Sequence, residues 1–271
     1  MMLTGIAHVH SRLSYDGVHD LTELAAFARG RGLDFVLMSE HNRTLTHETM
    51  AELVARCAAL TRESGVLMVP GIECEATPDY VHVLGYGTRE LVTTRDARGI
   101  VDRLRRGGAF TVLAHPMYRD ACSFVMPETL AGLDGWEVWN GKADGGLYPG
   151  DASVERLAEL RRRGAPLVPM AGADLHRLEA YPGITLEVRC EAPSESAILA
   201  ALRARAFRIR GGAWAFAASD PLRVPPRSAR RLAAGAALGV RRRAKRMHTW
   251  LAHHGLRPPA GVARAARRLL K

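Results

Sequence analysis

The chain has 271 residues, of which 47% are apolar, 24% charged and only 6% aromatic. That composition is globular, and the length suffices for the core of one large α/β domain or two small ones, which excludes a wholly disordered chain, collagen and a disulfide-stapled miniprotein. The formal net charge of +10 is unevenly distributed, because residues 221–271 carry 14 Lys and Arg without any Asp or Glu, whereas residues 1–220 carry 24 basic and 28 acidic side chains.

Short β-rich runs alternate with helical stretches rich in Ala, Leu and Arg, a pattern typical of βα units around a parallel sheet or barrel. In chain order the pattern predicts a strand at 3–10, a helix at 21–31, a strand at 34–39, a helix at 46–64, strands at 66–73 and 80–85, a helix at 96–107, strands at 109–115 and 135–139, a helix at 153–164, strands at 166–173 and 184–189, and a helix at 194–206. We therefore expect one α/β domain, 1–220, followed by the basic tail, 221–271.

Reactive side chains stand at the ends of these predicted strands. In parallel α/β architectures the carboxyl ends of the strands open on one face, so we expect these side chains to converge there. The set is His8, His10, Asp16, His41, Glu73, His82, His115, Asp174 and His176.

This set has the composition of a metal site. Side chains two residues apart on a strand point to the same side, so His8 and His10 can bind one ion, and Asp174 with His176 repeats the spacing. Mixed imidazole and carboxylate ligands suit Zn, Mn or Fe, and nine ligands suffice for two or three ions. The alternative is nine independent polar residues that cap turns or line a wet crevice, with His82 as a core histidine.

Six short segments, in order, resemble the polymerase and histidinol phosphatase (PHP) superfamily of metal-dependent phosphoesterases. They are His8-Val9-His10-Ser11 with Ser14-Tyr15-Asp16-Gly17, Ser39-Glu40-His41-Asn42, Gly71-Ile72-Glu73, His82-Val83-Leu84-Gly85, His115-Pro116, and Gly172-Ala173-Asp174-Leu175-His176. The segments 136–141 and 194–210 resemble the compact CehA/McbA-type subgroup of that superfamily.

The resemblance implies a distorted (β/α)7 TIM-like barrel with a trinuclear metal site. It implies that His8, His10, Glu73 and Asp174 hold the first ion, that Glu73 bridges to a second ion held by His82 and His115, and that Asp16, His41 and His176 hold the third. The family has Asp where this chain has Glu40, and we expect Glu40 to orient a ligand imidazole from behind. Glu75, two residues beyond Glu73, is the alternative to the bridging residue.

The implied activity is hydrolysis of a phosphate ester, a small phosphomonoester or a nucleotide, by a hydroxide that bridges the metals. Glu73 and His176 are the candidate catalytic residues, with His176 either a ligand or a proton donor to the leaving group. Candidate substrate-binding residues adjoin the motifs, each with solvation or turn capping as the alternative: Arg12, Arg43, Asn140, Lys142 and Arg177. Other functions left open are a phosphodiesterase or nuclease, and a non-enzymatic, metal-stabilised module that binds polyanions.

The pattern of apolar and basic residues in the tail, 221–271, predicts a basic amphipathic appendage with helices at about 228–254 and 260–270. Three interpretations compete: its apolar side packs on the barrel or a second subunit, it lies on an anionic membrane surface, or it binds nucleic acid through phosphates.

The four cysteines, at positions 57, 74, 122 and 190, show no CxxC spacing, and the N-terminus shows no export signal. We therefore expect reduced thiols in the core of a cytoplasmic protein, at most peripheral to a membrane.

Overall fold

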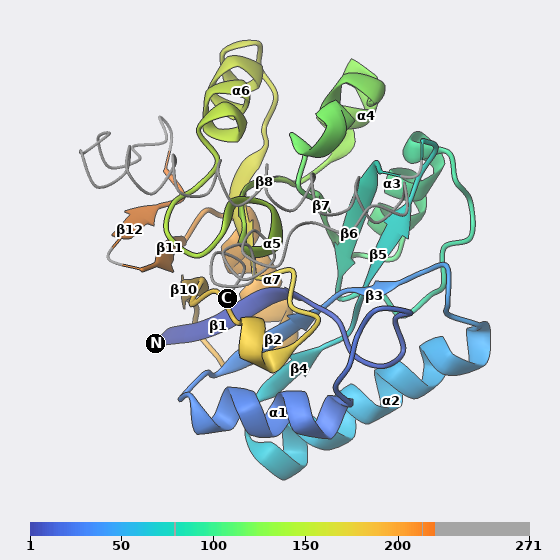
Figure 1. Ribbon diagram of the computed structural model, residues 1–271, viewed down its shortest axis with the longest axis vertical. Helices are drawn as coiled ribbons and strands as arrows, with labels where there is room; N and C mark the ends of the chain where they lie inside the picture. The colour runs from blue at the N-terminus through green and yellow to red at the C-terminus, as the bar shows by residue number, and fades with distance from the viewer. Residues whose placement is uncertain (79, 213, 220–271) are drawn as a thin grey trace, which may run out of the picture. The chain divides into compact units, whose positions relative to one another are not determined.

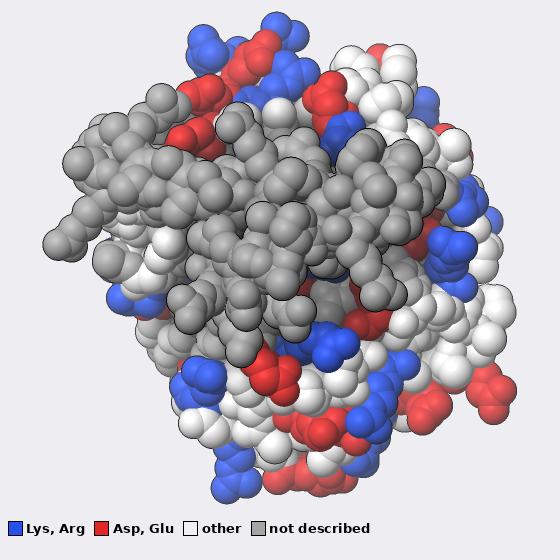
Figure 2. Space-filling model, viewed as in Figure 1, with Lys and Arg blue, Asp and Glu red and all other residues white. Residues whose placement is uncertain are grey.

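The computed structural model describes residues 1–78, 80–212 and 214–219 (Figure 1). The tail at 221–271, for which we predicted two helices, lies outside the described residues. Among the described residues, no helix has the length and hydropathy needed to cross a bilayer. On the face seen in Figure 2, Lys and Arg side chains are interspersed with Asp and Glu over the described part of the surface.

The strands form two six-stranded sheets. The first has the order β12-β11-β10-β1-β2-β4, in which β1 runs parallel to β2 and β2 to β4, and the other pairs are antiparallel. Its strands are β1 (Met2–Val9), β2 (Phe35–Met38), β4 (Leu67–Val69), β10 (Thr185–Arg189), β11 (Phe207–Gly211) and β12 (Trp214–Ala217).

The second sheet has the order β3-β5-β6-β7-β8-β9. The β3–β5, β7–β8 and β8–β9 pairs are parallel, whereas β6 runs antiparallel to both of its neighbours. Its strands are β3 (Glu40–His41), β5 (Gly71–Glu75), β6 (His82–Tyr86), β7 (Phe110–Leu113), β8 (Gly135–Asn140) and β9 (Val168–Gly172).

Helices cover the sheets, and α1 and α2 lie side by side along β2 and β4 (Figure 1). The first two helices begin with capping boxes, at Asp20 with Glu23 and at Thr46 with Thr49, which satisfy backbone N–H groups of the first turn. The helices are α1 (Leu21–Gly30), α2 (His47–Ser64), α3 (Ala97–Arg106), α4 (Pro127–Gly132), α5 (Gly141–Asp144), α6 (Asp151–Arg162) and α7 (Glu195–Arg203), with short 3-10 segments η1 (Tyr118–Phe124) and η2 (Leu178–Ala180).

The expected α/β architecture is confirmed, but the described strands do not form one closed sheet. The predicted strand at 66–73 is split into β4 and β5, whereas the predicted strand at 34–39 corresponds to β2 alone, with the two-residue β3 following it. The split falls at Pro70, which has no N–H to donate to a ladder. At the other edge, Leu175 N donates to His8 O and His10 N donates to Leu175 O, so backbone hydrogen bonds also link the segment after β9 to β1.

The expectation of a parallel arrangement is wrong for β10, which runs antiparallel to β1, and for β6. Only residues 76–81 separate β5 from β6, too few for the crossover that a parallel pair requires. His82 therefore stands at the start of its strand, paired with Glu75, and not at a strand end as we predicted. Because β6 is antiparallel, its start still meets the carboxyl end of β5.

The core contains the side chains expected to serve packing. Trp136 and Trp139 on β8 are fully buried, and their indole N–H groups donate to Ser153 Oγ and Gly145 O. All four cysteines are buried and unpaired. The two hydrogen bonds of the tryptophans attach β8, which lies beside the cluster of imidazoles described next, to the segment that follows it.

Candidate metal centre

The nine side chains predicted to bind metal lie together at one end of the strands. Three of them, His8, His115 and Asp174, have positive φ values of 62°, 28° and 49°. Such conformations cost a non-glycine residue about 1–3 kcal/mol and persist where the surrounding structure requires them. Three overlapping groups have ligand atoms within 4.8 Å of one another: His10, Asp16, His41 and His176; His8, Glu73 and His115; and His8, His10 and Asp174.

Glu73, on β5, is the centre of this cluster. Both of its carboxylate oxygens are buried and face imidazole nitrogens. The distances are 3.3 Å from Oε2 to Nε2 of His8 and of His10, 3.5 Å from Oε2 to Nδ1 of His41, 2.7 Å from Oε1 to Nδ1 of His82, and 3.1 Å from Oε1 to Nε2 of His115. The two oxygens face different sets of imidazoles, so one carboxylate can serve two ions.

His8 is oriented by a buried carboxylate that sequence reasoning missed, Glu137 on β8. Nδ1 of His8 lies 3.0 Å from Glu137 Oε1, and a carboxylate accepts, so Nδ1 carries a proton. Burial acts to lower the pKa of His8, yet the carboxylates of Glu73, Glu137 and Asp174 raise it well above its usual value, so Nε2, which faces Glu73, would release its proton on binding an ion. The other oxygen of Glu137 accepts from the backbone N–H of His115 at 2.7 Å. Gly172 leaves room for this arrangement, because a Cβ there would collide with both Glu137 and His8.

His10 is oriented through Ser14 by Glu40, in agreement with the place predicted for Glu40. The Ser14 hydroxyl donates its one proton to Glu40 Oε2 at 2.6 Å, so its oxygen can only accept from Nδ1 of His10, 3.3 Å away. Nε2 of His10 therefore presents a lone pair to Glu73. The backbone N–H of His41 donates to the same hydroxyl, and that of Ser11 donates to Glu40.

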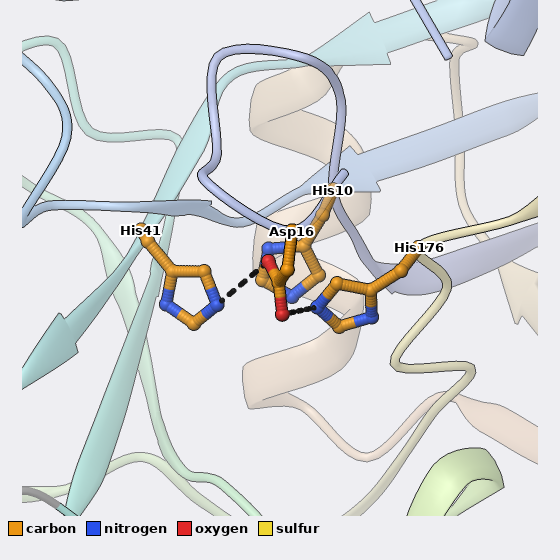
Figure 3. Close-up of side chains that lie close together, drawn as sticks. All are labelled: His10, Asp16, His41 and His176. Atoms are coloured by element: carbon orange, nitrogen blue, oxygen red, sulfur yellow. Dashed lines mark ion pairs between the residues drawn. The ribbon is translucent and has the colours of Figure 1, made fainter. Parts of the chain in front are cut away.

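Asp16 lies between two imidazoles at the outer side of the cluster, with His10 behind it (Figure 3). Its Oδ1 lies 3.4 Å from Nε2 of His41, and its Oδ2 lies 2.8 Å from Nε2 of His176. Nδ1 of His176 donates to the carbonyl oxygen of Asp174 at 3.0 Å, which turns Nε2 toward Asp16. Asp16, the most exposed of the nine with 30% of its side chain accessible, marks the mouth of the cluster.

Electrostatics explains why this cluster fits cations. Burial lowers the pKa of His10 well below its usual value, and the imidazoles of His176 and His8 act in the same direction. His10 is thus neutral, and its Nε2 lone pair faces an anionic oxygen of Glu73 with no hydrogen between them. Two acceptors 3.3 Å apart repel one another unless a cation lies between them.

Further buried nitrogens lack a hydrogen-bond partner in the same place. They include Nε2 of His8 and of His10, Nδ1 of His41 and Nδ1 of His115. Burial acts to raise the pKa of Glu73, yet the surrounding imidazoles, His8 and His82 foremost, bring it well below its usual range. Imidazoles, which release their protons on binding a metal, together with ionised carboxylates are the donor set of Zn, Mn or Fe sites, so these residues fit divalent ions.

Of the four predicted cationic substrate contacts, Lys142 reaches the mouth of the cluster. Its Nζ lies 3.4 Å from Nε2 of His176 and 3.7 Å from Oδ2 of Asp16. Arg43 extends toward Glu75, 3.7 Å away, whereas Arg12 donates to the carbonyl of Val18 and approaches Glu23. Arg177 is exposed on the segment that follows His176.

Asn140, the remaining predicted substrate contact, is buried in the support of the cluster. Its Nδ2 donates to Glu137 at 2.9 Å and to Asp174 at 3.2 Å, and its Oδ1 accepts from the N–H of Ala143. Asn140 and Glu137 are three residues apart on β8, where the register with β9 shifts. Glu137 could have been noticed in the sequence, because it is an acidic residue between the apolar Trp136 and Val138 of a predicted strand.

No family model matches the chain, and no curated protein matches it. Solved structures do resemble it. A two-domain protein from Bacteroides vulgatus ATCC 8482, which contains a predicted PHP-like metal-dependent phosphoesterase, has a TM-score of 0.61 at 19% identity over 78% of this chain and 65% of that one. PsfC from Pseudomonas syringae PB-5123 has a TM-score of 0.56 at 16% identity over 78% and 92%.

The lesion-specific endonuclease PfuEndoQ from Pyrococcus furiosus has a TM-score of 0.50 at 13% identity over 75% of this chain and 56% of that one. The chain thus spans about two thirds of the Bacteroides protein and just over half of the endonuclease. At these identities the likeness establishes the fold, which is PHP-like.

Proposed function

We propose that the chain is a metal-dependent hydrolase that acts on small phosphomonoesters or nucleotides. The observation that carries the proposal is Glu73, a buried carboxylate whose two oxygens face five imidazole nitrogens at 2.7–3.5 Å. In a protein that merely packed these groups, the lone pair of His10 Nε2 would face Glu73 at 3.3 Å with no cation to offset the repulsion. Resemblance to the CehA/McbA-type subgroup, a closed (β/α)7 barrel and three metal positions belong to this proposal.

The geometry suggests which residues hold the ions. His8, His10 and Asp174 with Oε2 of Glu73 form one position, and Oε1 of Glu73 with His82 and His115 forms a second. His41, Asp16 and His176 form the third, at the mouth. The grouping differs from the family pattern in two respects. His10 also lies within reach of the third position, and His8 also lies within reach of Glu73 and His115.

Divalent ions bound there supply hydroxide at neutral pH and neutralise phosphate charge as the reaction proceeds. The chain's own groups complete the site. Lys142 contributes a point charge for a phosphate oxygen at the mouth. His176 has its Nδ1 fixed by the carbonyl of Asp174, so Nε2 is the atom that binds an ion or holds a proton for the leaving oxygen. Glu137 and Asn140 keep the ligands in place from behind.

The test is metal analysis of the purified protein together with hydrolysis of a chromogenic phosphate monoester and diester. We expect bound divalent ions, turnover, loss of turnover after chelation, and recovery when Zn, Mn or Fe is restored. A pure, metal-loaded protein that hydrolyses neither ester would overturn the proposal.

A second candidate function is a phosphodiesterase or nuclease, favoured by the 14 Lys and Arg of residues 221–271. The rest of the chain, with 24 basic and 28 acidic side chains, lacks an excess of positive charge that could bind a polyanion. Nucleic-acid affinity would therefore depend on the tail and fall steeply with salt.

This alternative is tested in the full chain by changing Arg241, Arg242 and Arg243 to Gln. If the protein is a nuclease of this kind, oligonucleotide affinity and its salt dependence decrease while turnover of a small ester is unchanged. Unchanged oligonucleotide affinity would exclude a tail that binds nucleic acid through these residues and favour the monoesterase.

A further inference from the structure

Exposed apolar side chains gather in one short segment after His115. Among the described residues, eight large apolar side chains are exposed, and four of them lie between positions 116 and 126. We call 116–126 the rim segment. Its four exposed apolar residues are Met117, Tyr118, Phe124 and Met126. Single exposed apolar residues are ordinary on a protein surface, but such a concentration in one segment marks a binding surface.

The rim segment adjoins the candidate metal centre directly. The backbone N–H of Tyr118 donates to the carbonyl of His115 at 2.8 Å, and the Tyr118 ring lies edge-on to the imidazole of His115, 5.9 Å between centroids. The ring nevertheless remains open, because 49% of Tyr118 is exposed. A group attached to a phosphate at the cluster could therefore reach the free face of this ring.

Further aromatic and cationic side chains extend the surface away from His115. The guanidinium of Arg119 lies 5.4 Å from the ring centroid of Tyr118 and 5.8 Å from that of Tyr80. The Tyr80 ring in turn contacts Phe124 edge-on at 5.5 Å, and 51% of Phe124 is exposed. These contacts form a continuous strip from Tyr118 to Phe124.

The backbone holds this strip in an unusual conformation. Arg119 and its neighbour Asp120 have positive φ values of 51° and 57°. Two consecutive non-glycine residues in the left-handed region cost free energy, so the display of the Tyr118 and Arg119 side chains is imposed by the surrounding structure.

The strip ends at a cavity. Phe124 and Met126 form part of the wall of a space of about 620 Å³, a size typical of small-molecule sites. Thr77 and Ala97 also line this space. A substrate portion larger than one ring thus has room beyond Phe124.

We propose that the rim segment binds the organic part of the phosphate ester and selects a planar aromatic group, with Tyr118 as the residue that stacks on it. This inference rests on the proposed function, because the phosphate must lie at the cluster for its organic part to reach Tyr118. Stacking on an aromatic side chain suits any planar ring, whereas an alkyl group gains only the smaller area of contact.

The test uses two non-hydrolysable probes that share a phosphonate group, phenylphosphonate and methylphosphonate, with binding to the metal-loaded protein measured by calorimetry. We expect the full-length protein to bind phenylphosphonate about tenfold more tightly. Tyr118→Ala should reduce this ratio to near one while methylphosphonate affinity stays unchanged, and Tyr118→Phe should keep the ratio because the ring is retained.

Tyr15→Ala is the matched control, because Tyr15 is also an exposed ring beside the cluster but stacks on His41, on the other side. Its loss should leave the ratio of the two affinities unchanged. Equal affinities in the unmodified protein, or a ratio that survives Tyr118→Ala, would overturn the inference and leave the proposed function standing. If neither phosphonate binds, the proposed function fails together with the inference, and the missing methylphosphonate binding identifies that case.

Discussion

The inner and outer halves of the candidate metal centre are supported in different ways. In the inner half, His8 and Glu73 are almost fully buried, and the carboxylate of Glu137 holds His8 directly. In the outer half, Asp16 is partly exposed, and His176 is held by a backbone carbonyl.

This difference predicts unequal metal binding within one site. A carboxylate behind an imidazole raises its basicity and fixes its tautomer, whereas a neutral carbonyl does so less strongly. Burial also keeps water and competing ligands from the inner positions. We therefore expect ions at the inner positions to bind tightly and the ion at the mouth to exchange more easily.

The largest effect is expected at Glu73, the one residue that both inner positions share. Glu73→Gln removes the negative charge between five imidazoles, so we expect loss of the inner ions and a fall in turnover of more than about a hundredfold, since even residues that only orient ligands contribute about 10–100-fold. Metal content by atomic spectrometry and turnover of a chromogenic ester measure both consequences.

Glu75→Gln is the matched control, because Glu75 is a buried glutamate two residues further along the same strand. Its Oε1 lies 3.9 Å from Nδ1 of His41, farther than either oxygen of Glu73 lies from the imidazoles that it faces. We expect the inner ions to be retained. If Glu75→Gln instead emptied the inner positions and Glu73→Gln did not, the bridging role would belong to Glu75.

The next effect is at Glu137, which touches the inner half from behind. Glu137→Ala leaves Nδ1 of His8 and the backbone N–H of His115 without their acceptor, so metal affinity should fall about 10–100-fold. Chelator competition measures this loss. Equal affinity in Glu137→Ala and the unmodified protein would show that His8 needs no carboxylate behind it.

Glu137 also shows where sequence reasoning ends. Residues placed at strand ends by a simple alternation of elements were found together, because parallel strands open at one edge whatever their exact bounds. Glu137 lies between Trp136 and Val138 inside β8. Only the three-dimensional arrangement, in which β8 pairs with β9 and the segment after β9 is hydrogen-bonded to β1, reveals that it faces His8. Asn140, which donates to Glu137, was predicted to contact the substrate because the sequence alone does not show which residues the side chains of β8 face.

The direction of one strand and the contacts of long side chains were also not predicted from the sequence. His82 was expected at a strand end and lies at a strand start, because the short connection after β5 reverses β6. Arg12 and Lys142 both adjoin motif residues in sequence, yet long flexible side chains follow local partners that no motif records. The five predicted helices correspond to α1, α2, α3, α6 and α7, since caps and periodicity are local properties. The short elements α4, α5, β3, β11 and β12 were not predicted.

A smaller effect is expected in the outer half, at Asp16. Asp16→Asn keeps the shape but removes the charge between His41 and His176, so one ion per chain should be lost while the inner ions remain. We expect turnover to fall about tenfold, at the lower end of the range of about 10–100-fold found when a residue that supports a metal site is changed.

Asp102→Asn is the control for this loss of charge, since Asp102 is an exposed residue on α3 whose partner is Arg98. It should change neither metal content nor turnover. Loss of all ions on Asp16→Asn would contradict the division of the cluster into two halves that bind independently.

The smallest effect concerns the charge at the mouth. Lys142, with 55% of its side chain exposed, lies within 4 Å of Asp16 and Asp174, whereas Arg12, with 62% exposed, faces Glu23. An exposed charge contributes up to about 1 kcal/mol, so Lys142→Ala should raise KM for a phosphate ester about fivefold and leave kcat nearly unchanged. Arg12→Ala should change neither constant.

Because salt screens exposed charges, the difference in KM between these two variants should shrink as ionic strength rises. A KM effect of Lys142→Ala that did not depend on salt would mean that this lysine acts by holding Asp16 and not by contacting the phosphate.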